Sequence, residues 1–72
     1  MISFRSEREE KEVTISVDDG QTIGRTITVL REIGIFHTKA QIVRSMRTKE
    51  RIAIENTYKD SHIFNGDILM FE

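Results

Sequence analysis

The fifteen residues before the final Glu72 constrain the fold of this chain most strongly. The segment Thr57–Phe71 contains the turn signal Asn65-Gly66-Asp67, and four apolar residues, Ile68–Phe71, follow it directly. Glycine takes a positive φ at no steric cost, and asparagine tolerates it better than most residues. A short apolar run after a turn, rich in strand-forming residues, indicates a buried strand. Because an unprotected edge would expose this run, we expect it in the sheet interior with a neighbour on each side.

Two alternating segments near the start of the chain predict an antiparallel hairpin. Ile2 and Phe4 alternate with polar residues, and after the charged segment 7–12 a second set alternates in the same way, namely Val13, Ile15 and Val17. A period of two on both sides of a charged connection is typical of a hairpin with one buried face. The charged segment is expected to be its solvated tip.

A helix is predicted after the acidic break Asp18-Asp19-Gly20. Asp19 or Thr22 is the candidate N-cap. The apolar stripe of this helix consists of Ile23, Ile27 and Leu30, and we expect Val29 and Ile33 to widen it. Gly34 fits the C′ position, with Ile35 at C″ as in a Schellman motif.

Two further strands and a short helical turn are predicted between this helix and the closing strand. The strands are Gln41–Met46 and Arg51–Glu55, joined by a turn over residues 47–50. The register of the first of these strands is open. Either Ile42 and Met46 face the core, or Val43, on the opposite face of the strand, does. Tyr58 and Ile63, five residues apart across a polar segment, suit a single helical turn held at both ends by apolar side chains.

The predicted order is strand, strand, helix, strand, strand, helical turn, strand. One helix packed across one face of a mixed four- or five-stranded sheet is an α+β fold, and this arrangement is the ubiquitin-like β-grasp. The last strand would then pair with the first in parallel and lie centrally. Seventy-two residues form one domain, 1–72, without room for a second core.

The composition is that of an ordinary soluble chain. It is 38% apolar and 32% charged, and it has no Cys, which rules out disulfides and thiolate metal sites. No apolar run approaches a membrane span, and residues 1–5 do not form the apolar region of a signal peptide, so we expect a cytoplasmic protein without membrane insertion. The net charge of −1 provides no global attraction to nucleic acid or to an anionic membrane.

Residues 41–71 resemble the YukD/EsaB-type small ubiquitin-like proteins that accompany type VII secretion systems of Gram-positive bacteria. The resemblance lies in Ile54-Glu55-Asn56, Asp60, Ile63 and the ending 65–69, and more loosely in the spacing of the apolar helix residues. Arg44 departs from it, since an apolar strand residue is expected there. The resemblance implies a cytoplasmic accessory or regulatory factor whose partner is a component of the secretion apparatus.

No residue pattern in the chain indicates catalysis. Ubiquitin and the bacterial sulfur-carrier proteins end in Gly-Gly, whereas no glycine follows Gly66 here, so we do not expect conjugation or sulfur transfer unless the chain is truncated. His37 and His62 have no Cys or paired acids at metal-ligand spacing, and the serines have no evident base. Asp60 and Asp67 flank turns, where bonding of their carboxylates to backbone N–H groups is expected. We predict a non-enzyme without cofactor or metal.

The closing strand also predicts a binding surface. If Leu69 and Phe71 face the helix, Ile68 and Met70 must face away from it, because side chains alternate along a strand. Apolar residues on an open sheet face, rimmed by Arg44 and Arg51, would suit a protein partner or a homodimer. In the alternative, the N-terminal segment or a loop covers Ile68 and Met70.

A basic segment supports a second functional hypothesis. Four cationic residues fall within residues 44–51, namely Arg44, Arg47, Lys49 and Arg51. They would form either a solvated hairpin or a contact for nucleic acid or another anion in a small regulator. No aromatic residue lies among them and Glu50 interrupts them, so the protein-interaction hypothesis is preferred.

Overall fold

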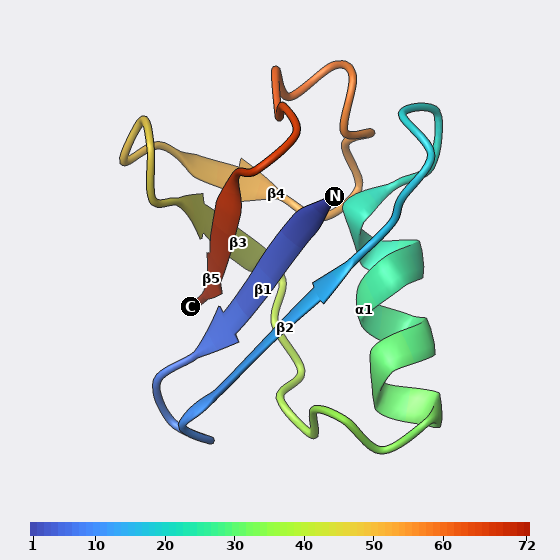
Figure 1. Ribbon diagram of the computed structural model, residues 1–72, viewed down its shortest axis with the longest axis vertical. Coiled ribbons are helices and arrows are strands. Elements are labelled where there is room, and N and C mark those ends of the chain that lie inside the picture. Colours follow the sequence, from blue (N-terminus) through green and yellow to red (C-terminus); the bar gives the residue numbers. More distant parts are fainter.

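Five strands and one helix make up the regular structure in the computed structural model, which describes residues 1–72. The elements are β1 (Ile2–Ser6), β2 (Lys11–Ile15), α1 (Ile23–Glu32), β3 (Ile42–Ser45), β4 (Arg51–Ala53) and β5 (Ile68–Phe71). The fold is therefore α+β, with one helix and a mixed sheet (Figure 1). The single helix is too short to cross a membrane.

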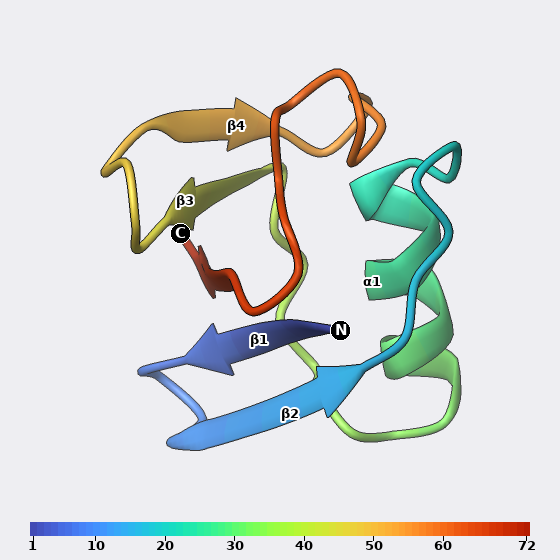
Figure 2. The same ribbon diagram turned by 45° about the horizontal axis from the view of Figure 1, so that its top comes forward.

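The closing strand lies at the centre of the sheet, as predicted. The strand order is β2-β1-β5-β3-β4, in which β5 runs parallel to β1 and antiparallel to β3 (Figure 2). Gly66, at the turn before β5, has the expected positive φ of +93°. The turn also connects β5 to β1, because Gly66 N donates to Met1 O at 2.8 Å and Ser3 N donates to Asp67 O at 3.0 Å.

The N-terminal hairpin forms as predicted, with β1 and β2 antiparallel. Ile2 and Phe4 are buried, whereas Val13 and Ile15 on β2 are half-buried. The tip is less simple than expected. The Glu9 carboxylate accepts hydrogen bonds from His37 N at 3.0 Å and Thr38 N at 2.9 Å, and it also accepts one from the Thr38 hydroxyl. The prediction of a merely solvated tip is therefore wrong for Glu9, which connects the tip to the segment after α1.

The ends of α1 agree with the sequence prediction, and the structure decides between the two N-cap candidates. Thr22, not Asp19, is the N-cap, and its hydroxyl accepts from Arg25 N at 3.1 Å. At the other end Gly34 has φ +82°, Gly34 N donates to Arg31 O, and Ile35 N donates to Leu30 O. These two bonds form the predicted Schellman motif.

The buried stripe of α1 is narrower than predicted. It consists of Ile23, Thr26, Ile27 and Leu30. Val29 is 39% exposed and Ile33 is 63% exposed, so the expectation that they widen the stripe is wrong. At about 100° per residue, both point to one flank of the helix rather than toward the sheet. On the other flank, Gly24 N donates to Ile54 O at 2.8 Å, just beyond β4.

The open register of β3 is resolved in favour of Val43. Val43 is 0% exposed and Ser45 is 2% exposed, so both face the core. Ile42 and Arg44 consequently lie on the opposite face of the sheet, which accounts for a charged residue at position 44. Both strands are shorter than predicted, and β4 ends at Ala53 rather than at Glu55.

The segment between β4 and β5 completes the core. Tyr58 and Ile63 are buried as expected, but the segment between them is a series of turns, with one hydrogen bond of the α-helical type, from Ser61 N to Thr57 O. The Tyr58 hydroxyl donates to Thr26 Oγ1 at 2.6 Å. Burial raises the pKa of Tyr58 to about 12, although its hydrogen bond with Thr26 acts in the opposite direction.

Candidate functional site

The predicted contact residues lie together on the face of the sheet opposite α1, the outer face. Leu69 is 0% exposed and Phe71 is 8% exposed, and both point into the core. Ile68 and Met70 alternate with them and are half-buried on the outer face. The alternation predicted for the closing strand is thus confirmed, and neither Ile68 nor Met70 is fully covered by another segment.

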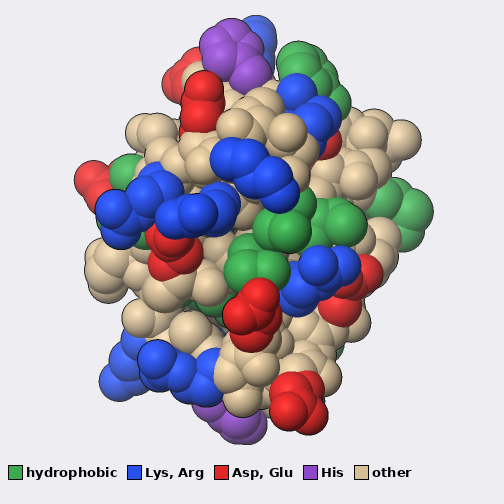
Figure 3. Space-filling model, turned by 90° about the vertical axis from the view of Figure 1, so that its left-hand side faces the viewer, with side chains coloured by type: hydrophobic (Ala, Val, Ile, Leu, Met, Phe, Trp, Pro, Cys, Tyr) green, Lys and Arg blue, Asp and Glu red, His purple; other side chains and the backbone are tan.

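Neighbouring strands extend this apolar surface. The other half-buried apolar side chains that point outward are Ile42 and Met46 next to β5 and Ala53 on β4. Met46 lies beside Ile68, because Met46 N donates to Ile68 O at 2.9 Å. We call the set Ile42, Met46, Ala53, Ile68 and Met70 the outer-face patch. Figure 3 shows hydrophobic side chains gathered near the middle of this side of the molecule, with charged side chains around them.

The charged rim consists of ion pairs rather than free charges. Arg44, opposite Met70 in the β3–β5 register, and Arg51 on β4 both bind Glu72, at 2.7 and 2.9 Å. On the other side of Met70, Arg5 of β1 binds Glu12 of β2 at 2.7 Å. Burial raises the pKa of Glu72, but the hydrogen bonds from the two arginines outweigh this effect and hold its pKa below the usual range.

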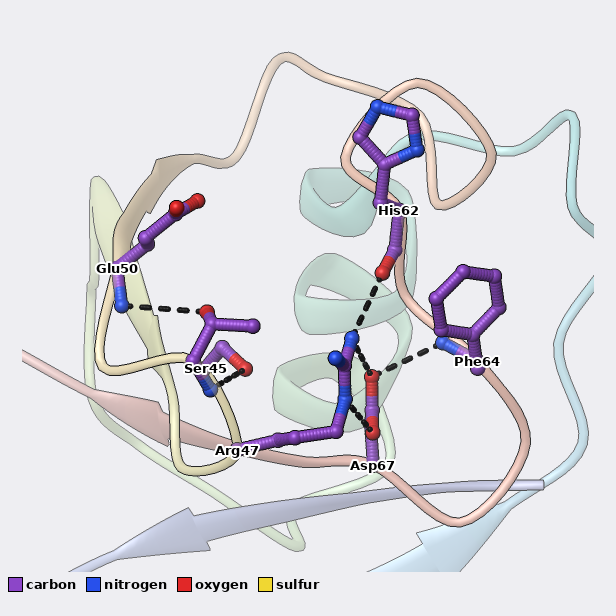
Figure 4. A network of polar contacts seen from close by, with 7 residues as sticks. Ser45, Arg47, Glu50, His62, Phe64 and Asp67 are labelled. Atoms are coloured by element: carbon purple, nitrogen blue, oxygen red, sulfur yellow. Dashed lines mark hydrogen bonds and ion pairs between the residues drawn. The ribbon is translucent and has the colours of Figure 1, made fainter.

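Arg47 does not join Arg44 and Arg51 as part of a free basic segment. Its Nε donates to Asp67 Oδ1 at 2.9 Å, and its Nη2 donates to Asp67 Oδ2 at 3.1 Å and to His62 O at 3.0 Å (Figure 4). Asp67 is 6% exposed, and it also accepts from Phe64 N at 2.9 Å. The hydrogen bonds from Arg47 lower the pKa of Asp67, burial opposes them, and the bond from Phe64 N lowers this pKa further. The network connects the β3–β4 turn to the segment that leads into β5.

The carboxylate–backbone bonding expected of Asp60 and Asp67 occurs only in Asp67. Asp67 accepts from a backbone N–H within its own turn, but its main partner is Arg47, which lies twenty residues away in the sequence. At Asp60 the backbone N–H is a donor, to Thr57 Oγ1 at 3.1 Å. The carboxylate of Asp60 has no hydrogen bond, so the prediction for this residue is wrong.

Phe64 is an exposed apolar residue that sequence reasoning missed. It is 59% exposed, and the Arg47 guanidinium lies 5.1 Å from its ring centroid, within cation–π range. Because Arg47 follows Met46 and Phe64 is hydrogen-bonded to the residue before Ile68, the aromatic ring lies near that end of the outer-face patch. The only sequence signal for this exposed ring was its position next to the turn 65–67, where an aromatic side chain does not have to be buried.

The geometry suits contact with a flat surface better than a small ligand. The cavities, of about 410, 390 and 280 Å³, lie around the hairpin tip and residues 37–39, and none is lined by a residue of the outer-face patch. Ligand pockets for small molecules are concave and largely apolar. No cluster of three or more His, Cys, Asp or Glu has a geometry that could hold a metal ion. His37 and His62 are both exposed.

Comparisons with protein-family models, with curated proteins and with solved structures found no match for this chain.

Proposed function

We propose that this chain is a ubiquitin-like β-grasp domain. The proposal is supported by the order β2-β1-β5-β3-β4, in which the first and last strands are parallel neighbours at the centre of the sheet. A single helix on one face and a hairpin before it agree with the same arrangement.

We further propose that the domain is a non-enzymatic protein-interaction module and that the outer-face patch is its contact surface. The observation that carries this proposal is the half-buried apolar patch on a sheet face that the helix does not cover. An apolar centre with a polar rim is the usual anatomy of a protein interface. Phe64 at one end, with the Arg47 guanidinium 5.1 Å from its ring centroid, would add an aromatic contact, and aromatic residues are enriched at interfaces.

The proposed partner is a component of a type VII secretion system, with this protein as a cytoplasmic accessory or regulatory factor. This part rests on the resemblance of residues 41–71 to YukD/EsaB-type proteins. The nucleic-acid alternative has less support, because Arg44, Arg47 and Arg51 are paired with carboxylates. Of the four cations in the basic segment, only Lys49 has no ion pair, and affinity for nucleic acid depends on cations that are free to contact phosphates.

The double variant Ile68→Ser/Met70→Ser tests the contact surface. Both side chains are half-buried, so their loss should cost about 1–2 kcal/mol of stability in total and leave the fold intact. Tagged variants are captured from cells that contain the secretion apparatus, and co-purified proteins are identified by mass spectrometry. We expect the wild type to capture a secretion-system component and the double variant to lose it.

Val29→Ser/Ile33→Ser is the matched control, since it removes two apolar side chains from the helix flank and leaves the outer face unchanged. The control should capture the same component as the wild type. Equal capture by the outer-face variant would refute the contact surface. Unfolding of that variant would show that Ile68 and Met70 belong to the core instead.

A further inference from the structure

The turn before β5 places an asparagine side chain next to an unshielded backbone nitrogen. Asparagine is a thermolabile residue, because the backbone nitrogen of the following residue can attack its side-chain amide carbon. A side chain on the following residue hinders this attack, and Gly66 after Asn65 has none. Both residues are exposed, and a Cβ placed at Gly66 would meet no atom within 4 Å. The turn therefore has room for the ring that the attack forms.

In the folded chain both reacting groups are hydrogen-bonded to Met1, directly before β1. Gly66 N donates to Met1 O at 2.8 Å, and Met1 N donates to Asn65 Oδ1. The nitrogen of Gly66 must lose its proton before it attacks, and a proton that is bonded to Met1 O is not available to water or hydroxide. The bond from Met1 N also fixes the side-chain amide of Asn65. The attack therefore requires the turn to separate from Met1.

We propose that Asn65 is a deamidation site whose rate is set by local opening of the contact between this turn and Met1. In the open state, Gly66 N loses its proton and bonds to Cγ of Asn65. The bond between Cγ and the amide nitrogen breaks, and this nitrogen leaves as ammonia after taking up a proton. Water then opens the resulting five-membered succinimide at either carbonyl, which leaves aspartate or isoaspartate at position 65. Water is the only co-reactant.

Either product changes the turn that leads into β5. Both add a carboxylate two residues before that of Asp67, which is paired with Arg47. Isoaspartate also carries the main chain through its side-chain carbons, which adds one backbone atom before Gly66. The turn is closed by Asp67 N, which donates to Phe64 O at 3.0 Å, and the added atom lies inside this closed loop. Loss of one such bond should raise the open population about fivefold, so isoaspartate weakens the turn.

The other asparagine of the chain, Asn56, provides an internal control. It is exposed, as Asn65 is. The residue after it is Thr57, whose β-branched side chain hinders access to its own backbone nitrogen. Asn56 should therefore stay unmodified under conditions in which Asn65 reacts.

The test compares the deamidation rate of the whole chain when folded with its rate when unfolded in guanidinium chloride, at one pH and temperature. Peptide mass spectrometry measures the conversion of Asn65, and amide exchange by NMR measures how often the N–H of Gly66 is open. When opening and closing are faster than the reaction, the rate follows the open population. The folded chain should deamidate about tenfold more slowly, as one or two hydrogen bonds allow. The exchange protection of the Gly66 N–H should show the same factor.

Two variants at position 65 separate the reaction from its consequence. Asn65→Gln keeps a side-chain amide, but its ring would have six members and would close far more slowly, so this variant should stay unmodified. After prolonged incubation the wild type should show a lower urea midpoint and faster exchange of the Gly66 N–H, whereas Asn65→Gln should keep its starting values. Asn65→Asp introduces the charge without the extra backbone atom. Chains with isoaspartate should therefore be less stable than Asn65→Asp.

Three results would overturn the proposal. Equal rates in the folded and unfolded chains would show that Met1 does not protect the turn. A folded chain slower by the factor of complete unfolding, about 100-fold or more, would show that local opening is not the route. Conversion of Asn56 as fast as that of Asn65, or no conversion of Asn65 even in the unfolded chain, would remove the site itself. None of these measurements involves the outer-face patch, so their failure leaves the proposed function unchanged.

Discussion

Substitution of Gly66 by alanine measures the strain that the turn before β5 would impose on any other residue. Gly66 has φ +93°, and a Cβ added there would meet no atom within 4 Å. Gly20 provides the matched control, because its added Cβ also meets nothing within 4 Å and its φ is not in the left-handed region. The two alanine variants therefore differ in backbone conformation and not in packing.

The magnitude follows from two opposing effects. Alanine restricts the unfolded chain and stabilises the folded state by about 0.4–1 kcal/mol where the conformation is compatible, so Gly20→Ala should be slightly more stable than the wild type. At Gly66 the left-handed conformation costs an L-residue about 1–2 kcal/mol. The entropic effect is common to both, so the difference between the variants should be about 1–2 kcal/mol. For Gly66→Val, β-branching should raise the loss toward about 3 kcal/mol.

Equilibrium urea unfolding followed by far-UV circular dichroism measures this difference. With a slope near 1 kcal/mol/M, the Gly66→Ala midpoint should lie about 1–2 M below that of Gly20→Ala. The loss is large for a domain of this size, whose core supplies about 3–5 kcal/mol. Equal midpoints would refute the reasoning, and they would mean that the turn relaxes to a negative φ without disturbing β5.

Two further predictions concern buried polar contacts. Arg47→Met should lower stability at pH 7, because the carboxylate of Asp67 loses its partner. Since the pKa of Asp67 is lowered in the folded state, its stabilisation is complete above about pH 4 and is lost as the pH falls through the folded pKa. The urea midpoint should therefore fall less between about pH 7 and pH 3 in Arg47→Met than in the wild type. An equal fall in both proteins would contradict the ion pair between Arg47 and Asp67. Tyr58→Phe should cost about 1–2 kcal/mol, because Thr26 loses its buried hydrogen bond. The raised pKa of Tyr58 means that wild-type stability falls above about pH 10, and a phenylalanine variant with the same alkaline loss would refute this explanation.

The sequence by itself determined the elements with a clear local signal. Period-two alternation identified β1 and β2, because side chains on a strand alternate between faces whatever the rest of the chain does. Gly34 and Gly66 were predicted from cap and turn preferences, which depend on the φ and ψ of one residue, and the same preferences reduced the N-cap to Asp19 or Thr22. The outward direction of Ile68 and Met70 followed from the same alternation once β5 was assigned. The β-grasp assignment, the identity of the partner and the contact role of the outer face remain proposals.

Only the tertiary structure decided which side chains meet across long sequence separations. Arg47 was grouped with Arg44 and Arg51 because the three are close in sequence, yet its partner is Asp67. Glu9 belonged to a charged segment with no local feature to mark it, and its partners follow α1. The exposure of Val29 and Ile33 depends on where the helix crosses the sheet, and their apolar character carries no information about that position. Local sequence patterns indicate the backbone conformation of one residue or the buried face of one element. Which charged side chains pair, and which apolar side chains stay exposed, depends on how the elements pack together, and the sequence patterns do not show that packing.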